Sequence, residues 1–127
     1  MAIKRDAADI NFSKCVRIRD KVCQRCGKGE NLECAHIYGR SKKSTRWSMD
    51  NAVALCHWCH RHYTSNPIQF HDDLLKLLGE GHMAILREKS NGIMKTNKLL
   101  RAEISKHYRN ELKQIEVDPD HCVISYN

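Results

Sequence analysis

Cys23-Gln24-Arg25-Cys26 and Cys56-His57-Trp58-Cys59 are two Cys-x-x-Cys pairs that enclose the segment 27–55. The two sulfurs of such a pair lie on one tight turn and can both reach a metal ion at about 2.3 Å. Redox-active or merely buried thiols are the alternative, but the matched spacing of the two pairs favours zinc. Because four protein thiolates leave a tetrahedral zinc ion no open position, the predicted zinc is structural. Its predicted ligands are Cys23, Cys26, Cys56 and Cys59.

The segment between the two pairs indicates a hairpin. Residues 31–38 indicate a short strand, the polar and basic residues 39–48 a loop, and residues 49–55 a returning strand. The second Cys-x-x-Cys turn then opens a helix that ends near residue 65. This order of turns, strands and helix predicts a ββα unit over about residues 22–66.

Further helices are predicted on both sides of this unit. Ser13 is expected to act as the N-cap of a helix that runs to about Val22. On the other side, Asn66-Pro67 indicates the start of a helix, and Gly79 indicates its end.

The C-terminal part also has helical spacing, in a short helix over residues 82–89 and a long one over about 93–117. The sequence therefore predicts an α+β fold. We expect one domain over residues 1–127, with a zinc-stapled ββα core and a helical C-terminal extension at about 67–117.

The amino-acid composition indicates the kind of partner and the cellular location to expect. Lys and Arg total 22 against 15 for Asp and Glu, and the formal charge of +7 favours an anionic partner such as nucleic acid over a plain solvated basic surface. An odd count of 7 cysteines without a secretory signal indicates a reducing compartment. Because no run is long and apolar enough to span a membrane, we expect a cytoplasmic protein without a membrane partner.

Two histidines lie near the predicted zinc turns. His36 falls on the first strand, and His60 directly follows Cys59 at the start of the helix. A neutral imidazole can take a proton from water, and an imidazole can also hold a divalent ion. Hydrolysis of a phosphodiester needs both functions on two sides of one phosphate. The alternatives are a strand histidine bonded to a backbone carbonyl for His36 and a capping or supporting residue for His60.

These residues carry a resemblance to a known family. They are the first Cys-x-x-Cys pair, then Ala35-His36, then the run from Asp50 to Cys56, and finally Cys59-His60. Over about residues 15–66, this pattern resembles the HNH (ββα-metal) endonucleases with a four-cysteine zinc. The chain is also similar to the phage NinG/Rap recombination nucleases in Phe12-Ser13-Lys14, Ser44-Thr45-Arg46-Trp47, Cys59-His60-Arg61-His62 and Asn66-Pro67-Ile68-Gln69-Phe70.

The resemblance implies roles for three residues. His36 takes the place of the general base, and Asn51 that of the asparagine whose side chain ties the loop backbone. His60 takes the place of a ligand of the catalytic divalent ion, with Mg²⁺ or Mn²⁺ expected. The implied products carry a 5′ phosphate and a 3′ hydroxyl.

One position departs from the family pattern. Many HNH enzymes have Asp or His directly before the base, as a second metal ligand, whereas this chain has Ala35. Either His60 binds the ion with water and phosphate oxygens, or Glu33 also reaches it. His57 and His62 are weaker candidates.

Basic residues around the predicted cleft are candidates for phosphate contacts. Arg40, Lys42, Lys43 and Arg46 lie in the loop between the strands, and Arg61 follows His60. A solvated basic hairpin is the alternative. Trp47 could stack on an unpaired base or pack in the core.

The expected function is metal-dependent DNA endonuclease activity in phage recombination, on duplex or branched DNA such as a Holliday junction or D-loop. Symmetric cleavage of a junction suggests a homodimer in the cytoplasm of a bacterial host. Two alternatives stay open: an HNH nicking or homing-type enzyme with sequence preference, and a non-catalytic zinc module that binds DNA.

Overall fold

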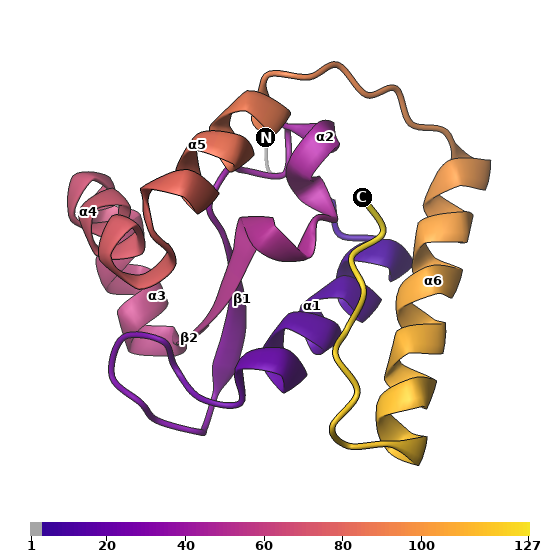
Figure 1. Cartoon of the computed structure of the whole chain (residues 1–127), viewed down its shortest axis with the longest axis horizontal. Coiled ribbons are helices and arrows are strands. Elements are labelled where there is room, and N and C mark those ends of the chain that lie inside the picture. The colour runs from indigo at the N-terminus through magenta and orange to yellow at the C-terminus, as the bar shows by residue number, and fades with distance from the viewer. Residues whose placement is uncertain (1–3) are drawn as a thin grey trace.

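The computed structural model describes residues 4–127 and has an α+β architecture, with a two-stranded antiparallel sheet and helices around it (Figure 1). The elements are α1 (Ala7–Asp20), β1 (Leu32–His36), α2 (Lys43–Arg46), the 3-10 helix η1 (Met49–Asn51), β2 (Ala52–Cys56), α3 (His57–Ser65), α4 (Pro67–Leu78), α5 (Glu80–Ser90) and α6 (Lys98–Val117). The predicted α+β class is confirmed. Within the described range, no helix is long and apolar enough to cross a membrane.

The first helix begins earlier than the sequence suggested. The carboxylate of Asp6 accepts a hydrogen bond from the backbone of Asp9, and the carboxylate of Asp9 accepts one from the backbone of Asp6. This reciprocal capping box starts α1 at Ala7, so the predicted N-cap Ser13 lies buried inside the helix. The usual capping box has Glu or Gln at this third position, and the shorter Asp made the signal less visible.

The two strands form the predicted hairpin, and α3 follows directly. β1 pairs antiparallel with β2, with Leu32 opposite Cys56 and His36 opposite Ala52. The connection is not a plain loop, because it contains α2 and ends in η1, which occupies the predicted start of the second strand. The backbone N–H of Ile37 donates to the carbonyl of Asn51 at 2.8 Å, which closes the hairpin at this end.

The C-terminal helices lie where the sequence predicts them, but two of them begin at other residues than predicted. α4 begins at Pro67 and stops before Gly79, which has a φ of +90° that favours glycine. α5 starts immediately afterwards, at Glu80, and not at residue 82. α6 starts at Lys98 and not near residue 93, because the side-chain oxygen of Asn97 caps the backbone N–H of Leu100 at 2.8 Å.

Two buried clusters position the elements. The first joins α1 to α6 and the hairpin connection, and its largest side chains are Phe12, Trp47 and Tyr108. The second lies beneath β2, α3 and α4 beside the cysteines, and includes Leu55 and Tyr63. The sheet lies between them, so residues on β1 and β2 are held from both sides.

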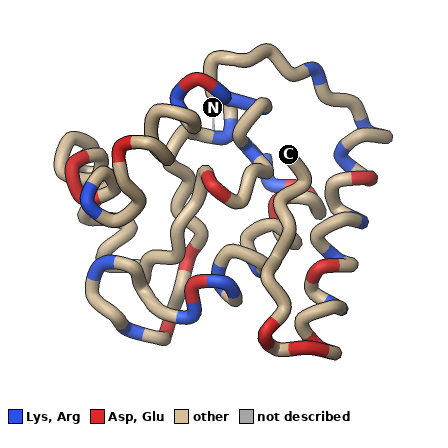
Figure 2. The backbone as a smooth tube through the Cα atoms, in the orientation of Figure 1, with Lys and Arg blue, Asp and Glu red and all other residues tan. Residues whose placement is uncertain are grey.

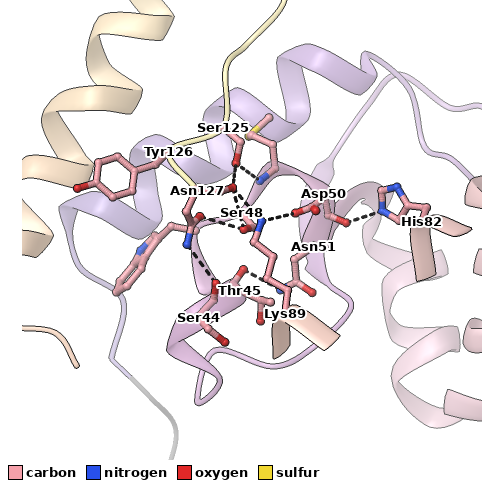
Figure 3. Close-up of polar contacts among 12 residues, drawn as sticks. Ser44, Thr45, Ser48, Asp50, Asn51, His82, Lys89, Ser125, Tyr126 and Asn127 are labelled. Atoms are coloured by element: carbon pink, nitrogen blue, oxygen red, sulfur yellow. Dashed lines mark hydrogen bonds and ion pairs between the residues drawn. The ribbon is translucent and has the colours of Figure 1, made fainter. Parts of the chain in front are cut away.

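The C-terminal tail packs back onto the hairpin connection. The hydroxyl of Ser48 donates to the side-chain oxygen of Asn127 at 2.9 Å, and the hydroxyl of Ser125 accepts from the backbone of Met49 at 3.0 Å (Figure 3). The ammonium of Lys89 on α5 also donates to Asn127. Through these contacts, the C-terminal tail holds η1 and the residues around Asn51 in place.

Candidate functional site

The four cysteines of the two Cys-x-x-Cys pairs form one cluster. Cys23 and Cys26 lie on the turn between α1 and β1, Cys56 ends β2, and Cys59 lies in the first turn of α3. Their sulfur atoms all lie within 4.8 Å of one another, and the sulfurs of Cys26 and Cys56 are 3.7 Å apart. The cluster therefore ties the turn after α1 to the start of α3.

This cluster has the geometry and chemistry of a structural metal site. In a tetrahedral site with Zn–S bonds of about 2.3 Å, neighbouring sulfurs lie about 3.8 Å apart. Burial opposes ionisation of Cys23, but hydrogen bonds from neighbouring backbone amides outweigh it and lower its pKa to about 6. Burial and the neighbouring sulfurs raise the pKa of Cys59 to about 12. A cation among the sulfurs would remove this conflict, so the four residues can hold an ion such as zinc.

His36, at the end of β1, has a defined orientation. Its ring stacks on Phe12, with centroids 5.6 Å apart, and its Nε2 lies 3.0 Å from the carbonyl oxygen of Arg46. Because a carbonyl only accepts, Nε2 carries the proton, and Nδ1 is the proton-accepting nitrogen of the neutral ring. Burial lowers the pKa of His36 below its ordinary value, and the bond to the carbonyl only partly opposes this effect. The ring is therefore neutral at pH 7.

Asn51 is buried and ties the hairpin connection together. Its Nδ2 donates to the carbonyl oxygens of Tyr38 at 2.9 Å and Thr45 at 3.0 Å, and its Oδ1 accepts from the backbone N–H of Tyr38 at 2.9 Å. The carbonyl of Thr45 is adjacent in the chain to the carbonyl that holds His36. Asn51 thereby fixes the backbone segment that orients the His36 ring.

The side chain of His60, in the first turn of α3, lies next to the side chain of Glu33 on β1. The Nδ1 of His60 is 2.8 Å from one carboxylate oxygen of Glu33, and the Nδ1 of His57 is 3.0 Å from the other. Partial burial favours the neutral acid, but the hydrogen bonds from the two histidines lower the pKa of Glu33. With Nδ1 bonded to Glu33, Nε2 is the nitrogen of His60 left for a metal ion.

One cleft brings these side chains together. It has a volume of about 620 Å³ and is lined by His36, Glu33 and His60, with Arg5, Arg17 and Arg40 among its other residues. Three predicted catalytic or metal-binding residues thus share one cavity with the predicted DNA-binding residue Arg40, whereas Asn51 acts on the cavity from the buried side. Ala35, the position that departs from the family pattern, is buried in the second cluster.

The predicted DNA-binding residues are not equivalent in the structure. Arg40 lines the cleft, and Lys42, Lys43 and Arg61 are exposed. Arg46 is buried instead, and its guanidinium makes two hydrogen bonds to the carboxylate of Asp9, at 3.0 and 2.6 Å. Its geometry is that of an internal ion pair, which leaves the guanidinium little exposed surface for a contact with DNA.

The structure adds residues that sequence reasoning missed. Arg5 and Arg17 reach the cleft because α1 begins at Ala7 and packs along β1. The late predicted start of the helix hid Arg5, and nothing near Arg17 in the sequence shows that this side of the helix faces β1. Trp58 is 70% exposed on α3, with the Arg61 guanidinium 5.9 Å from its ring, whereas Trp47 is fully buried. Of these two tryptophans, Trp58 and not Trp47 is free to stack on a ligand.

Comparison of the chain with protein-family models, curated proteins and solved structures finds no match.

Proposed function

We propose that the chain is a metal-dependent DNA endonuclease of the HNH type. The observation that carries this proposal is the shared cleft, in which a neutral His36 and the His60–Glu33 pair lie together beside the four-cysteine cluster. A base and a metal ligand in one cavity are what phosphodiester hydrolysis requires.

In the proposed reaction, His36 takes a proton from the attacking water through Nδ1. The carbonyl of Arg46 keeps the proton on Nε2, so the ring has the tautomer that a base needs. Asn51 holds the backbone next to this carbonyl and thereby limits rotation of the ring. The hydrogen bond to the carbonyl also stabilises the doubly protonated ring that forms when the water is deprotonated.

The divalent ion would bind to His60, with Glu33 as an orienting group or as a second ligand. A carboxylate on the other ring nitrogen fixes the orientation of a ligating histidine and makes it more basic. When bound, the ion would neutralise charge on the scissile phosphate and on the leaving 3′ oxygen. Mg²⁺ and Mn²⁺ both suit a site that combines carboxylate and phosphate oxygens with one imidazole.

The arginines of the cleft would bind the phosphates on either side of the scissile bond. Arg17 comes from α1, and Arg40 comes from the loop after β1. Their guanidinium groups can hold phosphate oxygens with two hydrogen bonds each. The resemblance to the NinG/Rap nucleases makes branched DNA our proposed substrate within this class.

A cleavage assay tests the proposal. Labelled four-way junction, its linear duplex and supercoiled plasmid are incubated with wild type, His36→Ala or His71→Ala, each with Mg²⁺ or Mn²⁺. His71 is an exposed histidine on α4 and serves as the matched control. Metal-dependent cleavage by wild type and His71→Ala, with a loss of about 10²–10⁴-fold in His36→Ala, is the expected result.

A non-catalytic zinc module that binds DNA is the second candidate. One observation favours it: His36 is partly buried and bonded to a carbonyl, as an ordinary structural histidine would be. In that case, wild type binds the three DNAs and cuts none of them with either metal. A nicking enzyme with sequence preference would instead cut the linear duplex at a defined site without need of a branch.

A further inference from the structure

A second and larger hollow opens next to the proposed catalytic cleft. It has a volume of about 930 Å³ and is lined by residues from the start of α1, the loop after β1 and one face of α6. Arg5 and Arg40 line both the hollow and the cleft, so the two adjoin at these residues. We call the larger one the basic groove.

One wall of the basic groove is a face of α6. Lys98, Arg101 and Arg109 line it, with the small side chains of Ala102 and Ser105 between them. These positions recur at the three- and four-residue spacing that places residues on one side of a helix. Figure 2 shows Lys and Arg recurring along α6. The small residues leave room for a ligand to approach the helix between the cationic side chains.

The opposite wall is basic as well. Lys4 and Arg5 precede α1, and Arg40 and Lys43 come from the hairpin connection. Asp6 is the acidic residue among those that line the groove, and its carboxylate lies 3.5 Å from the Nε of Arg101. The excess of positive charge across the groove therefore remains large after this pair is discounted.

Arg40 provides a second, independent observation in favour of an anionic ligand. Its Nη1 is buried and has no hydrogen-bond partner within the described residues. A buried donor without an acceptor is unfavourable, so such groups usually have a partner. Arg40 lies where the groove meets the cleft, and a phosphate oxygen there would be a suitable acceptor.

Both walls are rigidly supported. The Nδ2 of Asn11 on α1 donates to the Ser105 hydroxyl at 3.0 Å, and the thiol of Cys15 donates to the carbonyl of Tyr108. The Arg46–Asp9 ion pair fixes α2 against α1. The spacing of the charges is thus set before any ligand binds, which lowers the entropic cost of binding.

From this arrangement we infer that the basic groove binds the phosphate backbone of a DNA duplex and guides it into the catalytic cleft. The inference rests on the proposed nuclease function for the identity of the ligand. It assigns the C-terminal helix a role in substrate binding that lies outside the ββα unit. A backbone ligand fits better than a small anion because the charges are spread along a helix and continue into the cleft.

The test is the salt dependence of DNA binding. Zinc-loaded protein is titrated into a short fluorescein-labelled duplex without added Mg²⁺ or Mn²⁺, and the dissociation constant is measured by anisotropy at several salt concentrations. Each lost phosphate contact lowers the slope of log K against log salt by about 0.9. For Arg101→Gln/Arg109→Gln, we expect a slope smaller by about 2 and roughly tenfold weaker binding.

Two variants serve as controls. Lys76→Gln/Lys106→Gln removes the same charge from exposed positions that do not line the groove, one of them on α6 itself. Arg101→Lys/Arg109→Lys keeps the charge in the groove. We expect both to retain the wild-type slope, and circular dichroism checks that every variant folds.

Equal slopes and affinities for the groove variant and Lys76→Gln/Lys106→Gln would overturn the inference. Because the readout is binding without added Mg²⁺ or Mn²⁺, it is separate from the cleavage assay. A protein that cuts no DNA, but whose salt dependence of binding changes in the groove variant, would contradict the nuclease proposal. The groove would then remain as a DNA-binding surface.

Discussion

The carboxamide of Asn51 grips the backbone of Tyr38 from both ends, with its Nδ2 bonded to the Tyr38 carbonyl and its Oδ1 to the Tyr38 N–H, each at 2.9 Å. The same Nδ2 also reaches the carbonyl of Thr45. One buried side chain therefore replaces a stretch of backbone pairing where the hairpin widens. It joins the end of β1 to the segment that holds the His36 ring.

Replacement of Asn51 by alanine should destabilise the fold and loosen the site. Three backbone groups would lose their partner, and buried groups left unpaired cost about 1–3 kcal/mol each. We expect Asn51→Ala to lower the free energy of unfolding by about 3 kcal/mol, measured by urea denaturation. Asn110→Ala, at an exposed position on α6, should change it by less than about 0.5 kcal/mol. Similar effects of the two substitutions would contradict the role given to Asn51.

The ββα unit could be predicted from the sequence because the motifs that indicate it each span only a few residues. The Cys-x-x-Cys pairs, the Asn66-Pro67 start and the Gly79 stop each act over a few residues, and the structure has turns or helix ends at all of them. The extent of α1 was missed because Asp6 and Asp9 form a less common capping box.

Long-range contacts could not be predicted in the same way. Arg46 looked like a loop residue facing DNA, because nothing near it in sequence indicates its partner Asp9 on α1. The basic groove likewise depends on the packing of α6 along α1. The sequence shows the positive charges of α6, but it does not show that residues before α1 and in the hairpin connection form the opposite wall of the groove.

The cysteine cluster should make the fold dependent on zinc. We expect purified protein to contain stoichiometric zinc and to lose its thermal unfolding transition, or to melt at lower temperature, when a strong chelator removes the ion. Cys59→Ser should have the same effect because it removes one of the four ligands. Cys122→Ser removes an exposed thiol outside the cluster and should behave as wild type. Full stability of the chelated protein would exclude a structural metal.

The buried Arg46–Asp9 pair should set a pH-dependent difference in stability. Burial alone would raise the pKa of Asp9, but the hydrogen bonds from Arg46 and Asp6, together with the charge of Arg46, outweigh burial and lower it. In wild type, the contribution of Asp9 is present above the unfolded pKa of 3.8 and is lost as pH falls through the folded pKa.

Arg46→Met should therefore cost about 3–5 kcal/mol at pH 7, because it leaves the carboxylate buried without its partner. In this variant, the pKa of Asp9 is higher than in wild type because the hydrogen bonds and charge of Arg46 are gone, so protonation relieves the cost as the pH falls. We expect the difference in unfolding free energy from wild type to shrink between pH 7 and pH 4. Urea denaturation at each pH measures it, and a constant difference over this range would show that Asp9 does not titrate as expected.

The pH dependence of cleavage should report on His36. A general base is active when deprotonated, so kcat/KM should rise with pH through the pKa of the base. Because burial lowers the pKa of His36, the acid limb should lie below pH 6.5. Initial rates between pH 5 and pH 8, at saturating Mn²⁺, measure this limb. A midpoint above pH 6.5 would speak against a buried neutral histidine as the base.

Glu33 should control metal affinity more than the chemical step. Its carboxylate holds the Nδ1 of His60, and the loss of such a supporting group typically costs 10–100-fold in metal affinity or activity. Glu33→Gln keeps the size of the side chain and an acceptor oxygen but removes the charge. We expect the Mn²⁺ concentration for half-maximal cleavage to rise about 10–100-fold, with the rate at saturation nearly unchanged. Glu30→Gln, an exposed neighbour in the turn before β1, is the matched control and should leave the titration unchanged. An unaltered titration in Glu33→Gln would remove Glu33 from the metal site, and His60 would then be the protein ligand that this site retains.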